Sequence, residues 1–215
     1  MSRSTLHLPR LLLSLVASLG LASTASALSI PLNVEFDDAT IGNFGTVTVT
    51  QNGNALDFSV SLAGSVLGAN ADLHEFYFNL VGSPTGVAIS NTNAPNTAYV
   101  LSTNPSVAGG AGSSFEYGVG FGNGAGNPGN GVLTLATFTL SAIEPLTLAM
   151  LEQTSSTSGG VTVNVAAHVQ GTSLVPGVTS ETVGGSIVPE PGTLALVLSG
   201  LAGLAVSGRQ RFPAA

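Results

Sequence analysis

Residues 161–170 read Val-Thr-Val-Asn-Val-Ala-Ala-His-Val-Gln, the longest alternation of apolar and polar side chains in the chain. Successive side chains of a β-strand point to opposite faces, so this period of two predicts a strand with one buried face. We expect the valines to face inward, and Thr162, Asn164, His168 and Gln170 to face solvent.

The same alternation recurs along the middle of the chain. It is clear at residues 30–36, 56–62 and 115–121, and shorter candidate strands lie at 46–50, 73–80, 87–90, 98–101, 132–140 and 146–151. Connections rich in Gly, Asn, Pro and Ser separate them. About ten short strands predict an all-β fold, an antiparallel β-sandwich of jelly-roll-like or Ig-like type or a related barrel. Helical periodicity is absent from this part, although residues 143–152 are ambiguous.

The chain divides into four parts by composition. Residues 28–170 form the expected β-sandwich domain, whose length suits one domain. Residues 171–187 are rich in Gly, Ser, Thr and Val, and we expect a flexible linker, in which residues 178–183 could add an edge strand. The remaining parts, residues 1–27 and 188–212, are targeting segments.

The first 27 residues have the three-part layout of a secretory signal peptide. Arg3 and Arg10 precede or border an apolar stretch at residues 11–21, and a run of small residues ends with Ala25, Ser26 and Ala27. We expect a signal helix, and cleavage by signal peptidase after Ala27, with Ala25 and Ala27 as the recognised small residues.

The other end carries a short polar box, an apolar run and a basic stop. Pro189, Glu190 and Pro191 form the box, residues 193–208 form the run, and Arg209 and Arg211 follow it. The run has 16 residues, fewer than the about 20 that usually span a bilayer, so it suits a temporary anchor. The arginines would act as a stop-transfer signal and stay on the cytoplasmic side.

This order of elements resembles the PEP-CTERM sorting signal of Gram-negative bacteria, which the membrane protease exosortase recognises. The resemblance implies export, transient anchoring by a short transmembrane helix in the inner membrane, cleavage near the Pro-Glu-Pro box, and delivery to the cell surface or the extracellular medium. It implies no activity for the domain that precedes the signal.

Charge is distributed very unevenly along the chain. All four basic residues lie in the two targeting segments, and of the eleven acidic residues only Glu190 lies outside residues 28–187. Those residues therefore carry ten acids, no Lys or Arg, and a formal charge of −10. Without a cationic side chain to contact phosphates, nucleic-acid binding is excluded. The absence of cysteine excludes disulfides and thiolate metal sites.

Two groups of residues could in principle hold a metal ion. Asp72, His74 and Glu75 are close in sequence, but on a regular strand Glu75 faces away from the other two, which leaves Asp72 with His74. We expect a partly buried structural histidine there, on the same face as Phe76 and Phe78, and a distant, solvent-facing His168.

The second group, Glu35, Asp37 and Asp38, is dense enough to suggest Ca²⁺ ligation. It lacks the spacing of known calcium loops, so a solvated acidic turn is the alternative. We therefore assign neither a metal nor a cofactor to the chain.

Catalytic signatures are weak. The Gly-rich stretch 124–129 matches a dinucleotide fingerprint formally, but a strand and not a helix is predicted after it. No nucleophile elbow occurs. Glu116 and Glu144 could act as the paired carboxylates of a glycoside hydrolase, although the absence of Trp argues against aromatic sugar subsites.

The sequence therefore favours a non-enzymatic, exported structural or adhesive protein that associates with exopolysaccharide, as in a biofilm matrix. The alternatives are a carbohydrate-active hydrolase and a Ca²⁺-dependent binding module.

Overall fold

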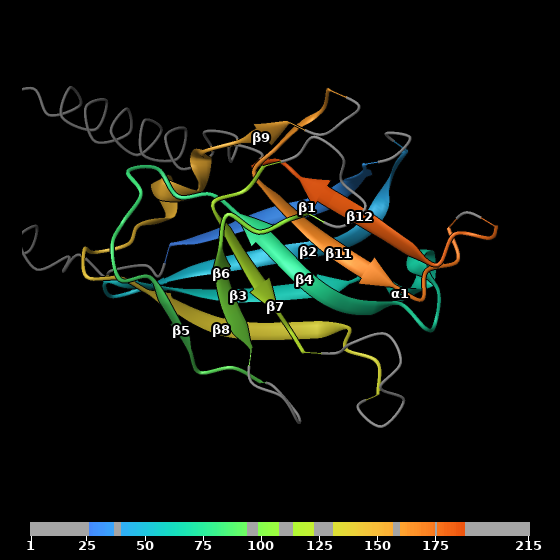
Figure 1. Cartoon of the computed structure of the whole chain (residues 1–215), viewed down its shortest axis with the longest axis horizontal. Helices are drawn as coiled ribbons and strands as arrows, with labels where there is room; N and C mark the ends of the chain where they lie inside the picture. The colour runs from blue at the N-terminus through green and yellow to red at the C-terminus, as the bar shows by residue number, and fades with distance from the viewer. Residues whose placement is uncertain are drawn as a thin grey trace, which may run out of the picture.

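The structure, a computed structural model, describes residues 26–36, 40–93, 99–107, 114–122, 131–156, 160–174 and 176–187. Figure 1 shows that these residues form a strongly curved antiparallel sheet with few helical turns. The all-β prediction is therefore confirmed. The expected signal helix and C-terminal membrane helix lie outside the described residues.

Ten strands make up the main sheet. They are β1 (Ala27–Glu35), β2 (Ile41–Asn52), β3 (Ala55–Leu62), β4 (Asp72–Phe78), β5 (Ala88–Ser90), β6 (Val100–Thr103), β7 (Tyr117–Gly120), β8 (Leu135–Ser141), β11 (Val165–Gln170) and β12 (Ser180–Gly185). Their order is β5-β8-β3-β2-β1-β12-β11-β4-β7-β6, and each neighbouring pair is antiparallel. A separate pair consists of β9 (Ser155–Ser156) and β10 (Thr162–Val163).

The expected division into two sheets is not confirmed, because the ten strands are hydrogen-bonded in one continuous sheet. The sheet curls until its two edge strands, β5 and β6, lie close to each other, so the architecture is barrel-like and nearly closed. Alternation in the sequence reports which face of a strand is buried, but it does not identify the strand that pairs with it, so a sandwich and a barrel share the same pattern.

Aromatic side chains fill the interior of the curled sheet. The rings of Phe58 in β3 and Phe138 in β8 are stacked with centroids 4.9 Å apart. Phe58 also contacts Phe76 and Phe78 of β4, at 5.9 and 5.5 Å. Because β4 is far from β3 and β8 in the strand order, these contacts cross the interior and hold the opposite walls together.

Residues 180–185 are part of this sheet and not of a linker. β12 pairs with β11 on one side and with β1 on the other, so it is an interior strand rather than the possible edge strand at residues 178–183. The sheet thus extends past the domain boundary expected at residue 170. Gly184 and Gly185 give this segment the composition of a linker, but here they permit close packing, since a Cβ at Gly185 would lie 1.9 Å from the Pro31 carbonyl oxygen.

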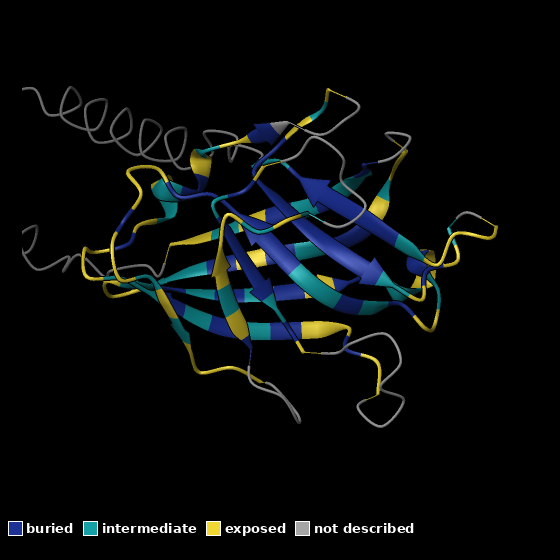
Figure 2. Cartoon of the chain, in the orientation of Figure 1, coloured by how far each residue is buried: buried dark blue, intermediate teal, exposed yellow. Residues whose placement is uncertain are grey.

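The middle of the sheet is buried on both faces. Figure 2 shows β11 and β12 almost entirely as buried residues. The outer face carries a second apolar cluster of Phe36, Tyr77, Phe115, Val163 and Ala166. Two of the four outward residues predicted for segment 161–170 are consequently buried.

Two local predictions differ from the structure. Residues 146–151, expected as a strand, contribute instead to the 3₁₀ helix η1 (Leu148–Glu152). The strand expected at 161–170 is interrupted at Asn164, which is 4% exposed and donates from Nδ2 to the carbonyl oxygens of Leu151 and Glu152 at 3.1 and 3.0 Å. The side chain predicted to face solvent therefore anchors η1 to the sheet. The one α-helix among the described residues, α1, is short (Gly64–Leu67).

The close approach of β12 to β1 can be tested by replacing Gly185 with alanine. Since the new Cβ overlaps the backbone oxygen of Pro31, β12 must shift, and we expect Gly185→Ala to lower the free energy of unfolding by about 2 kcal/mol or more. Denaturant unfolding followed by circular dichroism measures the loss.

Gly64→Ala is the matched control. A Cβ at Gly64, in the first turn of α1, meets no atom within 4 Å, so the stability should stay the same or rise slightly. Equal stability of both variants would contradict the tight β1–β12 contact.

Candidate functional site

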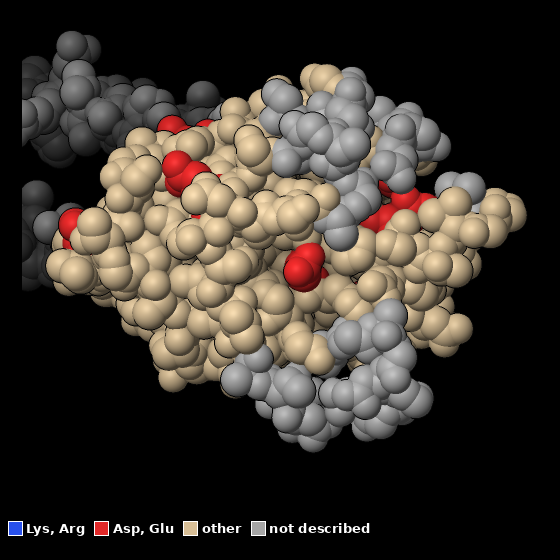
Figure 3. Space-filling model, viewed as in Figure 1, with Lys and Arg blue, Asp and Glu red and all other residues tan. Residues whose placement is uncertain are grey.

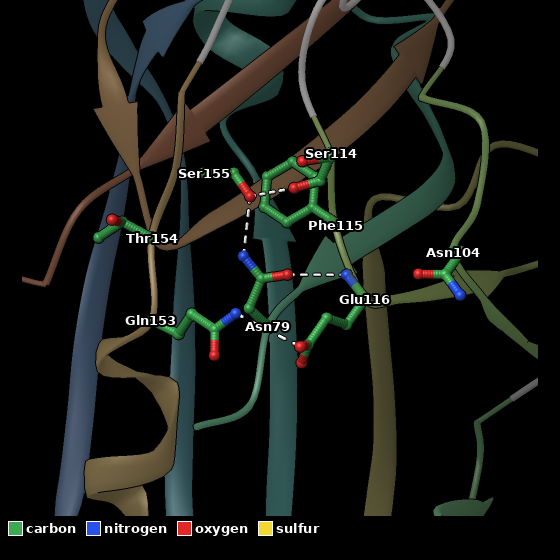
Figure 4. A pocket seen from close by; sticks show the side chains of 8 residues that line it. All are labelled: Asn79, Asn104, Ser114, Phe115, Glu116, Gln153, Thr154 and Ser155. Carbon is green, nitrogen blue, oxygen red and sulfur yellow. Dashed lines mark hydrogen bonds between the residues drawn. The ribbon is translucent and has the colours of Figure 1, made fainter. Parts of the chain in front are cut away.

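A polar pocket lies where four distant chain segments meet. Its volume is about 460 Å³, and it is lined by Asn79, Asn104, Ser114, Phe115, Glu116, Gln153, Thr154 and Ser155. These residues come from the end of β4, the end of β6, the segment before β7, and the connection from η1 into β9. Figure 4 shows Glu116 at the centre, with Gln153 and Asn104 on opposite sides of it.

Asn79 holds the floor of the pocket together. It is 2% exposed, donates from Nδ2 to Ser155 Oγ at 2.8 Å, and accepts at Oδ1 from the backbone N–H of Glu116 at 2.7 Å. Ser155 Oγ in turn donates to the carbonyl oxygen of Ser114. Buried polar groups that are fully bonded in this way fix their surroundings rigidly.

The Glu116 carboxylate accepts three long hydrogen bonds. The backbone N–H of Leu80 lies 3.2 Å from Oε2, and Ser83 Oγ and Gln153 Nε2 lie 3.4 Å from Oε1. A carboxylate has about four acceptor positions, and these long contacts leave it able to accept a further, shorter bond.

Glu144, the other carboxylate considered for hydrolysis, is bound to the same loop as Glu116. The backbone N–H and the Oγ1 of Thr85 both donate to it at 2.8 Å, whereas Glu116 accepts from Ser83. The backbone hydrogen bond from Thr85, followed by its hydroxyl bond, lowers the pKa of Glu144. A general acid for glycoside hydrolysis needs the opposite shift, a raised pKa.

The structure brings together the two histidines that the sequence left apart. The rings of His74 in β4 and His168 in β11 have centroids 6.2 Å apart in an edge-to-face arrangement. Asp72 is paired with His74 as the sequence suggested, with Oδ2 3.2 Å from Nε2. Tyr77 donates its hydroxyl to the Glu75 carboxylate nearby.

The predicted face of His74 is wrong, and so is the predicted solvent exposure of His168. The register between β4 and β11 shifts here, with His168 opposite Glu75 and Val169 opposite Leu73, so His74 is an extra bulged residue. The bulge turns His74 toward His168 and away from Phe76 and Phe78, which lie in the main core. His168 is only 5% exposed, because the outer face of β11 is covered; Ser180 and Thr182 of β12 contact its ring nitrogens at 3.3 Å.

Glu35 ends β1 and is 3% exposed, so it does not lie in a solvated turn. Asp37, Asp38 and the Gly-rich stretch 124–129 lie outside the described residues. Within the described ranges, no group of three or more His, Asp or Glu side chains is arranged to hold a metal ion.

The predicted targeting residues are mostly beyond the part of the chain that the structure describes. Ala25, Pro189, Glu190, Pro191, Arg209 and Arg211 fall outside it, whereas Ala27 is the first residue of β1. Among the described residues, no helix has the length and apolar character needed to cross a membrane. The segment 193–208 lies outside the described residues.

Comparison with known protein families identifies the C-terminal segment. A family model described as the PEP-CTERM protein-sorting motif matches residues 188–211. No curated protein and no solved structure matches the chain significantly. The residues of the pocket and of the histidine pair lie outside the matched segment.

The buried histidine predicts a pH dependence of stability. Burial lowers the pKa of His168 from its ordinary value near 6.5, an effect that His74 increases and Glu75 opposes. The unfolded chain therefore binds a proton at a higher pH than the folded chain does, and the free energy of unfolding falls as the pH drops below about 6.5. The contribution of His168 to the slope is at most about 1.4 kcal/mol per pH unit.

We expect His168→Gln, which keeps hydrogen-bonding groups for Ser180 and Thr182, to lose less stability than the unsubstituted protein between about pH 7.5 and about pH 5.5. Denaturant unfolding at several pH values measures both slopes. Identical slopes would show that His168 titrates normally in the folded protein.

Proposed function

Because the chain is a PEP-CTERM domain-containing protein, targeted for export and processing by exosortase, we propose that it is a non-enzymatic structural or adhesive component of an exopolysaccharide matrix. The match to the sorting motif at residues 188–211 carries this proposal. Cleavage near Pro189, Glu190 and Pro191 then releases the β-domain from the inner membrane to the cell surface or the surrounding medium.

The position of β1 supports signal peptidase as the first processing partner. The expected cleavage after Ala27 leaves Leu28 as the first residue, and from there β1 pairs with β2, beginning with Leu28 opposite Val49. Removal of the leader thus costs the sheet only the pair of Ala27 and Thr50 and the bond from Gln51 N–H to Ser26 O.

The state of the carboxylates supports a binding role over the hydrolase alternative. Glu144 has a lowered pKa and two bonds from Thr85, which stabilise its charged form. Retaining or inverting hydrolysis needs one carboxyl group that is protonated near neutral pH. A hydrolase remains the second candidate only through Glu116, which lines the pocket.

The negative charge of the processed domain limits the kinds of polysaccharide with which it can associate. Figure 3 shows separate acidic side chains and no Lys or Arg on the visible face. A domain with ten acids and no Lys or Arg is repelled by acidic polysaccharide, and only bridging divalent cations can attract it. Neutral polysaccharide imposes no such requirement.

Replacing Pro189, Glu190 and Pro191 together with alanine tests the processing step. Export should continue, because the signal peptide is unchanged, but the precursor should accumulate uncleaved in the inner membrane. Cell fractionation and the apparent size on immunoblots measure this outcome. Pro176→Ala, a proline substitution in an exposed turn before β12, should be processed normally. Release of the triple variant at the normal size would refute processing at the box.

Retention on the producer's own polysaccharide tests the matrix role. We expect the exported protein to co-sediment with the purified polysaccharide, and to be released by EDTA if the polysaccharide is acidic, because chelation removes the bridging cations. An absence of retention both with and without added Ca²⁺ would overturn the matrix role. Hydrolysis of the polysaccharide, detected as new reducing ends, would instead favour the hydrolase.

A further inference from the structure

We propose that the pocket around Glu116 binds a single neutral, hydroxyl-rich unit, such as a sugar residue within a polysaccharide chain. The inference rests on the proposed function for the source of the ligand, but its chemistry comes from the pocket. The volume of about 460 Å³ lies within the usual range of about 300–1,000 Å³ for small-ligand sites.

The walls of the pocket are fixed before any ligand arrives. Asn79 and Ser155 are buried and bonded to each other and to the segment that carries Ser114 and Glu116. Phe115 is 3% exposed and stacks on Tyr77 with ring centroids 5.8 Å apart. A pocket with fixed walls loses little conformational entropy on binding.

The groups that face the open side of the pocket are free to bond. The side chains of Asn104 and Thr154 make no hydrogen bond within the described part of the chain, and Gln153 uses its Nε2 alone, toward Glu116. The side-chain amides of Gln153 and Asn104 lie on opposite sides of the Glu116 carboxylate and offer both donors and acceptors, whereas the Thr154 side chain points away from it (Figure 4). This is the set of groups that pairs with sugar hydroxyls, each of which both donates and accepts.

Charge and ring exposure narrow the ligand class further. The carboxylate of Glu116 is the charged group that lines the pocket, and the described residues contain no Lys or Arg to offset it. Phosphates and uronic acids are therefore repelled, whereas hydroxyl groups donate to a carboxylate strongly. The ring of Phe115 is already covered by Tyr77, so hydrogen bonds and not ring stacking must provide recognition.

The backbone conformation beside Glu116 is a second, independent observation that indicates a binding site. Ser83, Asn91 and Asn104 are the non-glycine residues with positive φ in the described chain. Two of them contact Glu116: Ser83 donates to its carboxylate, and the backbone N–H of Asn104 donates to its carbonyl oxygen at 2.8 Å. Such conformations cost energy and concentrate at binding sites.

The test uses the full chain in a polyoxyethylene detergent, whose headgroup carries no sugar. Cellobiose, maltose and lactose are the neutral probes, and digalacturonate is the anionic one. We expect at least one neutral disaccharide to shift the side-chain amide NMR signals of Asn104 and Gln153, and digalacturonate to leave them unchanged. Addition of Ca²⁺ alone should also leave them unchanged.

A double variant, Asn104→Gly with Gln153→Ala, should weaken the binding of the active disaccharide about tenfold, as expected for the loss of two modest hydrogen bonds. Glycine accepts the positive φ of Asn104, so the backbone is kept. Asn91→Gly makes the same exchange at φ 49° outside the pocket lining, and it should leave the affinity unchanged.

Several results would overturn the assignment: no response to the three neutral probes, a response to digalacturonate or Ca²⁺ alone, or equal binding by the double variant. If the probes fail while the protein is still retained by the producer's polysaccharide, the pocket assignment is wrong and the proposed matrix role stands. If the probes bind at the pocket but the polysaccharide does not retain the protein, the matrix role is wrong and the pocket is still a sugar site.

Discussion

The structure depends on the placement of β12 between β1 and β11. Without it, the main sheet would separate into a half from β5 to β1 and a half from β11 to β6. The contact is possible because Gly184 and Gly185 carry no side chain: a Cβ on them would meet Phe36 at 2.5 Å and the Pro31 carbonyl at 1.9 Å. The absence of two side chains thus lets the sheet curl as one piece and lets aromatic rings meet across its interior.

The double-sided burial of the central strands explains where polar chemistry collects. Since the outer face of β11 and β4 is covered, the polar side chains there lie against one another: the rings of His74 and His168 meet edge to face, and Glu75 accepts a hydrogen bond from Tyr77. The second apolar cluster also holds Phe115 against Tyr77. This fixes the segment before β7, and with it the Glu116 side of the pocket.

Sequence patterns predicted the regular elements well and the irregular ones poorly. Residues 56–62 alternate cleanly and form β3 within one residue of the expected limits. The bulge at His74 and the interruption at Asn164 could not be predicted, because each depends on a partner strand or on η1, both distant in sequence. Of the residues that line the pocket, the sequence identified only Glu116 as a candidate functional residue. Asn79, which anchors it, directly follows the aromatic residues of β4, and a polar residue in that position ordinarily marks just the end of a strand.

The sequence by itself determined the PEP-CTERM sorting signal of the protein, its all-β class, and the absence of Lys, Arg and Cys from residues 28–187. These properties are local or compositional: a sorting signal is read as a linear segment, and a period of two is written in consecutive residues. The tertiary structure decided that there is one nearly closed sheet, that a glycine-containing segment with the composition of a linker is an interior strand, and that four segments meet around Glu116. Those features depend on pairing and packing between residues far apart in the chain. The free energy of folding there depends on how well whole strands and side-chain surfaces fit together, and not on the polarity of single residues.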